Sequence, residues 1–285
     1  MKHVLTVDVE DWYHVENLRR AIPPERWSGM EARLDGNVDR LLTLFAERGV
    51  QATFFVLGAA AERHPRVVRR IAEAGHEVAS HGWSHDLIYR QDPGTFREET
   101  RRSKALLEDL AGAAVDGYRA STFSVTQKSL WALDILAEEG FSYDSSIAPL
   151  RHDRYGIPGA PLEPHLRELE GGRKLAEFPV SFFRVLGCRF PLGGGFFRLF
   201  PLRWIVKGLQ RYAARGVPGG IYLHPWEIDP HQPRVEGLGL LPRFRHYVGL
   251  SRTHAKLDSL LRAVSFTTMR DALSATFPEV AEQPR

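Results

Sequence analysis

Hydrophobic and polar positions come in alternating blocks along the chain, and these blocks predict short buried strands separated by amphipathic helices. The apolar runs at 4–9 and 52–57 are continuous, which is typical of parallel strands that are buried on both faces. Between them, a stripe of apolar residues has helical spacing, with Asn37 as the predicted N-cap and Gly49 as the end of the helix.

The same alternation continues to the end of the chain. Further strands are predicted at 77–79, 115–119, 141–143, 178–183, 220–223 and 266–269. Further helices are predicted at about 66–74, 96–110, 130–139, 202–214, 256–263 and 270–275. Loops or irregular segments are predicted at 150–175, 193–197 and 229–250. Single strands alternating with helices predict βαβ units and a parallel sheet of seven or eight strands, either a closed barrel or an open doubly wound sheet.

Composition and charge narrow the class of protein. The 285 residues suffice for one large α/β domain, and no linker divides them. The net charge of +3 is small beside 38 basic and 35 acidic residues, so nucleic acid is not an expected partner. No glycine-rich phosphate loop follows the first strand, which argues against nucleotide binding.

The chain offers few signals for export or for disulfides. Its single cysteine, Cys188, cannot form a disulfide within the chain or build a cysteine-based zinc site. No window of about 20 apolar residues predicts a transmembrane segment. The first apolar stretch is too short for the core of a signal peptide, so we expect a cytoplasmic protein.

Polar residues with chemical potential follow the predicted strands. In a parallel barrel the carboxyl ends of the strands share one face, which carries the active site. The residues expected on that face are Asp8, Glu10, Asp11, His81, His85, Arg119, Asp144 and His224.

Two of these residues, His81 and His85, have a spacing suited to a metal. If the chain is helical there, residues four apart lie on one face and both imidazoles can bind one ion. One carboxylate with two histidines is a ligand set for a hydrolytic divalent metal. A second carboxylate could accept a proton from water, and another histidine could protonate a leaving amine. This combination suits amide hydrolysis.

These residues resemble the motifs of the NodB-type polysaccharide deacetylases, carbohydrate esterase family 4. Residues 6–11 are similar to the first motif of the family, 75–85 to its metal motif, 117–119 to its arginine motif and 222–224 to its closing Leu-His motif. The resemblance covers about 3–230 in the order of the family. It implies a single NodB-like domain over 1–285, a distorted (β/α)7 barrel with an extension at about 150–285 woven into it.

The resemblance also implies roles for individual residues. His81 and His85 would bind a divalent metal, with Zn²⁺ preferred over Co²⁺, Ni²⁺ or Mn²⁺. Asp8 would be the general base, Arg119 would orient it, and His224 would be the general acid. The substrate would be an N-acetylated glycan.

Three details depart from the pattern of the family or stay open. The family's paired aspartates are spread here, so Glu10 is the first choice for the third ligand and Asp11 the second. Ser121 stands where the family usually has proline, which affects the loop whose backbone N–H groups, near 121–123, would stabilise the oxyanion. The carboxylate partner of the acid histidine could be Asp144, Glu177 or Asp229.

Aromatic residues near the motifs are candidates for sugar stacking. Trp12 and Trp226 adjoin catalytic motifs and are preferred. The full set of predicted substrate-binding residues is Trp12, Tyr13, His14, Trp83, Phe123 and Trp226. The runs at 8–14, 143–146, 193–198 and 224–230 further resemble deacetylases of exosortase (PEP-CTERM) and exopolysaccharide gene clusters, which implies a role in exopolysaccharide biosynthesis.

Two other functions remain open on sequence grounds. A cyclic amidase of the allantoinase or imidase type would use the same scaffold on a small ureide or imide. A carbohydrate-binding protein without turnover would keep the cavity but not the chemistry. The sequence does not predict the oligomeric state.

Overall fold

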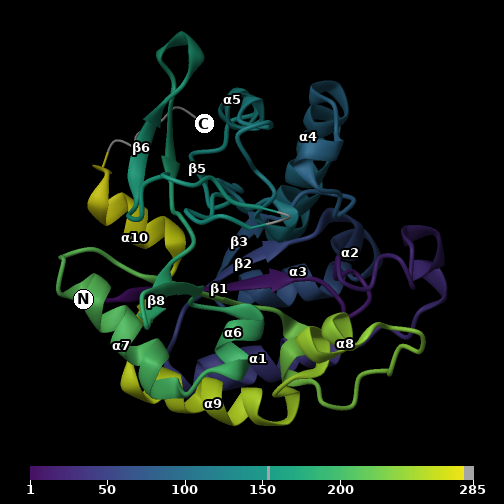
Figure 1. The fold of residues 1–285 in the computed structure, drawn as a ribbon. Helices are drawn as coiled ribbons and strands as arrows, with labels where there is room; N and C mark the ends of the chain where they lie inside the picture. The colour runs from purple at the N-terminus through teal and green to yellow at the C-terminus, as the bar shows by residue number, and fades with distance from the viewer. Residues whose placement is uncertain (153–154, 279–285) are drawn as a thin grey trace.

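The computed structural model describes residues 1–152 and 155–278, and within these ranges one curled sheet organises the chain (Figure 1). The strands of this sheet are β1 (His3–Val9), β2 (Thr53–Val56), β3 (Glu77–Ser80), β4 (Gly117–Tyr118), β5 (Tyr143–Asp144), β6 (His165–Glu168), β7 (Lys174–Glu177), β10 (Gly220–Leu223) and β11 (Phe266–Thr267). A separate hairpin is formed by β8 (Phe182–Val185) and β9 (Cys188–Pro191).

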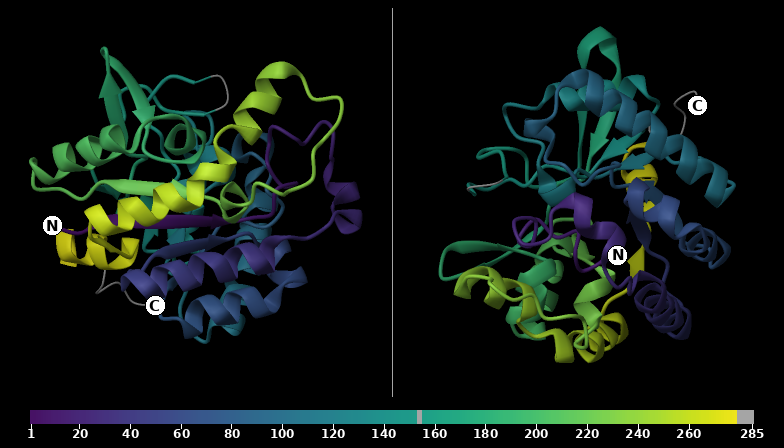
Figure 2. Two further views of the ribbon diagram at one scale, coloured as in Figure 1. Left: turned by 90° about the horizontal axis from the view of Figure 1, so that it is seen from below. Right: turned by 90° about the vertical axis from the view of Figure 1, so that its right-hand side faces the viewer.

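Helices follow most of the strands and pack around the sheet (Figures 1 and 2). They are α1 (Leu34–Arg48), α2 (Gly58–Arg63), α3 (Pro65–Glu73), α4 (Pro93–Ala111), α5 (Trp131–Glu138), α6 (Gly194–Leu199), α7 (Leu202–Ala213), α8 (Leu240–Tyr247), α9 (Leu250–Ala263) and α10 (Met269–Thr276). Short 3-10 turns include Ser121–Phe123 and Pro225–Ile228. No helix in the described ranges has the length and apolar composition needed to cross a membrane.

The sheet runs in the order β10-β1-β2-β3-β4-β5-β7-β6, with β11 also paired to β1. Every pair is parallel except β6 with β7 at the edge. The predicted α/β fold with a mostly parallel sheet is confirmed, and the sheet is a curled half-barrel. The chain between β7 and β10 spans 178–219, and within it Gly193 forms a single bridge to Tyr222 of β10.

Burial explains why the central strands form. Every residue of β1 is buried, so this strand packs on both faces, as its continuous apolar run predicts. The apolar stripe of α1 packs on one side of the sheet, and this helix ends at Gly49, whose φ of 59° is the left-handed conformation that favours glycine. The start of α4 is capped by Asp92, which accepts hydrogen bonds from the amides of Gly94 and Thr95.

Five local predictions were wrong. The predicted loop at 150–175 contains β6 and the start of β7. The apolar run 178–183 is buried, but only its last two residues enter a strand, β8, because the sheet pairs through 174–177 instead. The predicted irregular segments at 193–197 and 229–250 contain α6 and α8. Asn37 lies inside α1 and is not its N-cap.

His76 links the fold to a pH-dependent stability. Its Nδ1 accepts a hydrogen bond from the amide of Ala52 at 3.2 Å, and its ring packs against Phe45 and Phe54. Burial lowers the pKa of His76 to about 4. The imidazole of His76 therefore stays neutral in the folded state at pH values where the unfolded chain already binds a proton, below about 6.5.

We expect this histidine to reduce the free energy of unfolding as the pH falls from about 6.5 towards 4, with a slope of up to about 1.4 kcal/mol per pH unit. The stability is fully present above pH 6.5, because both states then hold a neutral imidazole. His76→Asn removes the titrating group, so its urea unfolding between pH 7.5 and 5 should show a shallower pH dependence than that of the unchanged protein. Equal slopes for the two proteins would contradict this assignment.

Candidate functional site

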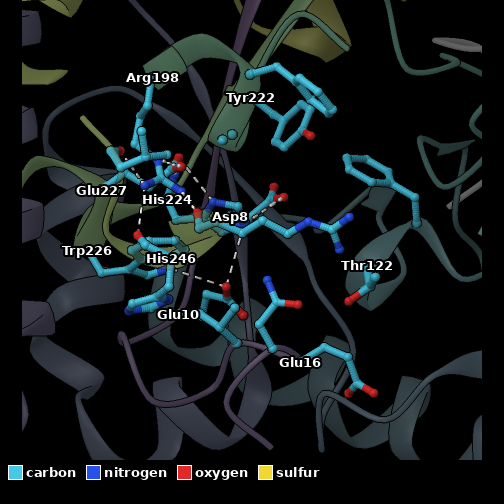
Figure 3. Close-up of a pocket in the computed structure, with 18 of the residues that line it drawn as sticks. Asp8, Glu10, Glu16, Thr122, Arg198, Tyr222, His224, Trp226, Glu227 and His246 are labelled. Carbon is cyan, nitrogen blue, oxygen red and sulfur yellow. Dashed lines mark hydrogen bonds and ion pairs between the residues drawn. The ribbon is translucent and has the colours of Figure 1, made fainter. Parts of the chain in front are cut away.

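The carboxyl ends of four parallel strands bring the chemically active side chains to one cavity (Figure 3). Asp8 lies near the end of β1 and Glu10 directly after it, while His81 follows β3. Arg119 follows β4 and His224 follows β10. The parallel registers align these ends, with Val56 opposite Ser80, Ser80 opposite Tyr118 and Val7 opposite Leu223. The predicted gathering of strand ends on one face is therefore present.

Glu10, His81 and His85 form a buried cluster. Each offers one ligand atom, and these atoms lie within 4.8 Å of one another. Nδ1 of His81 lies 2.8 Å from the carbonyl oxygen of Arg119 and donates to it, which leaves Nε2 as the free lone pair. This is the arrangement by which proteins orient a histidine towards a metal.

The chain around the two histidines is not helical, contrary to the spacing argument. Gly82 and His85 have φ angles of 74° and 59°, so a tight loop follows His81. Nε2 of His85 lies 2.6 Å from Oε2 of Glu10. Nδ1 of His85 is buried and has no hydrogen-bond partner among the described residues. Burial raises the pKa of Glu10, but the neighbouring histidines, His85 foremost, outweigh it and lower that pKa overall.

Asp11, the second choice for the third ligand, has a structural position instead. Its Oδ2 accepts hydrogen bonds from the amides of Arg33 and Leu34 at the start of α1, at 2.8 and 3.1 Å. Its Oδ1 accepts from the amide of Trp12 at 2.9 Å. Burial raises the pKa of Asp11 to about 6, although these three amides act in the opposite direction. The structure therefore places Glu10, and not Asp11, beside the two histidines.

Asp8 and Arg119 form a buried ion pair at the base of the cavity. Nη1 of Arg119 donates to Oδ1 of Asp8 and to Oγ1 of Thr6, both at 2.7 Å. Nη2 donates to Oγ of Ser145 at 3.0 Å, and the guanidinium lies over the ring of Phe55. These contacts fix the carboxylate of Asp8, whose Oδ2 is 3.9 Å from Nε2 of His224.

His224 is oriented by Glu227, a residue that the sequence argument did not single out. Nδ1 of His224 lies 3.2 Å from Oε2 of Glu227, and Nε2 lies 3.5 Å from Oε1 of Glu10. Burial lowers the pKa of His224, but the hydrogen bond and charge of Glu227, with the charges of Glu10 and Asp8, raise it to about 9. The spacing of three residues in a turn after β10 was the signal available in the sequence.

The three predicted partners of His224 lie elsewhere. Asp144 accepts hydrogen bonds from the amide and hydroxyl of Ser146, and Glu177 accepts one from the amide of Ile147. Asp229 pairs with Arg33. All three predictions are wrong, because the adjacent 3-10 turn supplies a nearer carboxylate.

Arg198 of α6 connects the His224–Glu227 pair to the C-terminal part of the chain. Its Nε donates to Oε1 of Glu227 at 2.7 Å. Its other nitrogens donate to the carbonyl oxygens of Arg245, His246 and Val248 at 2.7–2.9 Å. The buried guanidinium therefore holds Glu227 and the end of α8 in one arrangement (Figure 3).

The cavity has a volume of about 370 Å³ and changes in character along its length. The charged cluster lines one part of the cavity, and aromatic and aliphatic side chains line the rest of the cavity wall. These are Phe123, Tyr155, Phe196, Leu199, Tyr222, Trp226, Leu241 and Phe244. The ring of Trp226 is stacked between His224 and His246, with centroid separations of 5.3 and 4.7 Å. Such a lining suits the apolar faces of sugar rings.

Only two of the six predicted substrate-binding residues, Phe123 and Trp226, line this cavity. Trp12 and Tyr13 are buried behind the cavity wall, in an apolar cluster that also contains Trp226, and His14 packs beside them against Trp27. Trp83 packs over Gly58 and beneath the guanidinium of Arg102. The acidic run at 8–11 reaches the site, but the chain after it turns into the protein interior.

The turn at 121–123 lies at the wall of the cavity. Thr122 and Phe123 have φ angles of 57° and 53°, and both line the cavity. The amide of Phe123 donates to the carbonyl of Ala120 at 3.0 Å. The amide of Phe123 is therefore not an oxyanion donor, and the predicted donor within this turn is restricted to its first two residues.

The donor set fits a divalent transition metal. Two imidazoles and one carboxylate are the ligands of hydrolytic zinc sites that keep positions open for water and substrate. The carboxylate of Glu10, which lies beside Nε2 of His85, and the oriented ring of His81 both meet that requirement.

Part of the chain resembles known polysaccharide deacetylases. Residues 29–140 match the family model described as polysaccharide deacetylase. Residues 145–274 match a second model, described as a domain of unknown function, DUF3473. The first match supports the predicted resemblance to polysaccharide deacetylases over 29–140.

Proteins similar to part of the chain include two bacterial enzymes. The chain is 28% identical over 166 residues to the peptidoglycan-N-acetylglucosamine deacetylase of Bacillus cereus. The matched region covers 53% of this chain and 60% of the relative. It is 32% identical over 110 residues to the peptidoglycan deacetylase of Helicobacter pylori, covering 39% and 36%. The chain therefore spans less than two thirds of the length of these relatives.

Solved structures show the same fold. A structure from Mycobacterium smegmatis named as a polysaccharide deacetylase has a TM-score of 0.65 at 23% identity, and covers 100% of this chain and 93% of that one. The PuuE allantoinase has a TM-score of 0.61 at 18% identity, covering 96% and 90%. These likenesses establish the NodB-like scaffold that deacetylases share with an allantoinase.

Proposed function

We propose that this chain removes N-acetyl groups from the amino sugars of a glycan, with a divalent metal held by Glu10, His81 and His85. One observation carries the proposal. A three-ligand cluster, the Asp8–Arg119 pair and the His224–Glu227 pair all face one cavity with an aromatic lining. A divalent ion bound there would supply Lewis-acid activation of water and of the acetyl carbonyl.

The residues of the chain divide the proton transfers between them. Asp8 accepts a proton from the attacking water, and the ion pair with Arg119 holds its carboxylate in place. The water oxygen bonds to the acetyl carbon, and the bond from that carbon to the sugar nitrogen breaks. Nε2 of His224 donates a proton to this nitrogen, so acetate and a free amine leave. Glu227 holds the imidazole so that Nε2 faces the cavity.

Two observations favour Zn²⁺, with Co²⁺, Ni²⁺ and Mn²⁺ as alternatives. Two imidazole ligands suit zinc and its neighbours better than Mg²⁺ or Ca²⁺, which prefer oxygen ligands. The buried position of the cluster also favours an ion that binds few ligands tightly.

The identity of the glycan is also part of this proposal. The named relatives act on peptidoglycan. The motifs shared with exosortase (PEP-CTERM) gene clusters favour an exopolysaccharide or a lipid-linked precursor of one, and the match of 145–274 to a separate model supports a specialised C-terminal region. Because that region supplies His224 and Glu227, we infer that 1–285 acts as one unit.

An assay of acetate release tests the function against its rivals. The metal-loaded protein should release acetate from N-acetylated chito-oligosaccharides, peptidoglycan or bacterial exopolysaccharide, and it should leave allantoin unopened. The scaffold shared with an allantoinase makes the ureide the necessary control. Ring opening of the ureide without acetate release would favour the cyclic amidase. Glycan binding without release of acetate from any of the three would favour a binding protein.

A further inference from the structure

Exposed apolar side chains gather at the mouth of the cavity. Of the six large hydrophobic residues that are exposed in the described part of the chain, four belong to α6 and α8. They are Leu199, Leu240, Leu241 and Phe244, with exposed fractions of 48%, 89%, 56% and 53%. Leu199, Leu241 and Phe244 also line the cavity, so both helices contribute to its wall. Clustered exposure of this kind marks an interaction surface.

The same helices lie in parts of the chain that have no acidic residues. The stretches 178–226 and 237–257 together hold 11 of the 38 Lys and Arg residues and none of the 35 Asp and Glu residues. The rest of the chain therefore carries a net negative formal charge. Arg243 and Arg245 are exposed on α8 between the apolar side chains, and no described carboxylate pairs with either of them.

This surface is held in a fixed position. The last carbonyl groups of α8 and the residue after it accept hydrogen bonds from buried Arg198. The same guanidinium holds Glu227 beside His224. The exposed helix is therefore tied to the acid pair and keeps its apolar residues directed outward beside the site.

We propose that the docking rim, formed by Leu199, Leu240, Leu241, Arg243, Phe244 and Arg245, binds the surface of a lipid bilayer that contains anionic lipids. Leucine and phenylalanine side chains insert at the boundary between headgroups and acyl chains, while arginines contact lipid phosphates. A second copy of the chain fits the rim less well, because a two-fold contact through it would bring Arg243 and Arg245 against their own copies. The mouth of the cavity then faces the membrane.

The consequence for the substrate rests on the proposed function. If the site removes acetyl groups, its substrate is an amino sugar carried on a lipid at that surface. The docking itself is independent of this chemistry, so it is measured without any substrate.

Co-sedimentation of the full chain with lipid vesicles tests the proposal. The chain should bind vesicles of phosphatidylcholine with added phosphatidylglycerol, and bind more weakly to phosphatidylcholine alone or at high salt. The double variant Leu240→Asp with Arg243→Glu should lose at least about tenfold in affinity for the anionic vesicles. Neither residue lines the cavity, so hydrolysis of a soluble oligosaccharide should stay unchanged.

Leu186→Asp is the matched control, because Leu186 is 99% exposed but lies in the turn between β8 and β9, away from the rim. It should retain vesicle affinity within about twofold. An equal loss in Leu186→Asp, or no binding of anionic vesicles by the unchanged chain, would overturn the proposal. A dimer in sedimentation velocity that the double variant dissociates, without vesicle binding, would show that a second copy covers the rim. Vesicle binding without acetate release would instead refute only the proposed function.

Discussion

Replacing Glu10 with alanine is expected to remove the bound metal and to lower kcat/KM for acetate release by at least about a thousandfold, because Lewis-acid activation supplies several kcal/mol. The carboxylate contributes one of the three ligand atoms of the cluster. Its Oε2 lies 2.6 Å from Nε2 of His85, so the substitution also removes the carboxylate partner of that histidine. The metal content of the purified variant, measured by elemental analysis, gives a readout that does not depend on activity.

Asp11→Asn is the matched control for this prediction. Asp11 accepts three backbone hydrogen bonds, two of them from the start of α1. Its replacement should cost about 1–2 kcal/mol of stability and leave the metal content unchanged. The reverse outcome, with metal lost from the Asp11 variant and retained in the Glu10 variant, would contradict the assignment of the third ligand.

The strand ends explain which parts of the site could be predicted from the sequence. Asp8, His81, Arg119 and His224 each stand at or just after a run of buried apolar residues, and a parallel sheet brings such ends together. The choice between Glu10 and Asp11 depends on which side chain the turn after β1 directs into the cavity. Spacing alone does not encode that direction. The amides at the start of α1 determine it, because they donate hydrogen bonds to Asp11.

Other parts of the site depend on tertiary contacts. Glu227 is adjacent in sequence to the motif of His224, but its importance comes from Arg198, which lies 29 residues earlier in α6. Trp12 and Tyr13 follow the acidic run in sequence, yet they pack in the interior, because aromatic residues serve cores as readily as binding sites. The sheet edge formed by β6 and β7 was missed for a similar reason. The strongest apolar run nearby, 178–183, fills the gap beside β10. Only its last two residues belong to a strand, where they begin β8.

His224→Ala is expected to lower kcat for N-deacetylation by roughly a hundredfold to ten-thousandfold while the metal is retained, which is the range for loss of a general acid. Nε2 of this histidine faces the cavity, and it lies 3.5 and 3.9 Å from the carboxylates of Glu10 and Asp8. A sugar amine is a poor leaving group and needs a proton as the carbon–nitrogen bond breaks. A nitrophenolate leaving group does not need one.

The two kinds of leaving group separate the role of an acid from a structural role. Hydrolysis of p-nitrophenyl acetate by His224→Ala should fall by less than about tenfold, whereas release of acetate from the amino sugar falls by the full amount. Glu227→Gln provides the intermediate case, because it keeps a polar partner near Nδ1 but removes the charge that pairs with Arg198. It should reduce N-deacetylation less than the alanine variant does and show the same preference for the activated ester. Equal losses on both substrates in His224→Ala would mean that the histidine maintains the shape of the site and does not deliver the proton.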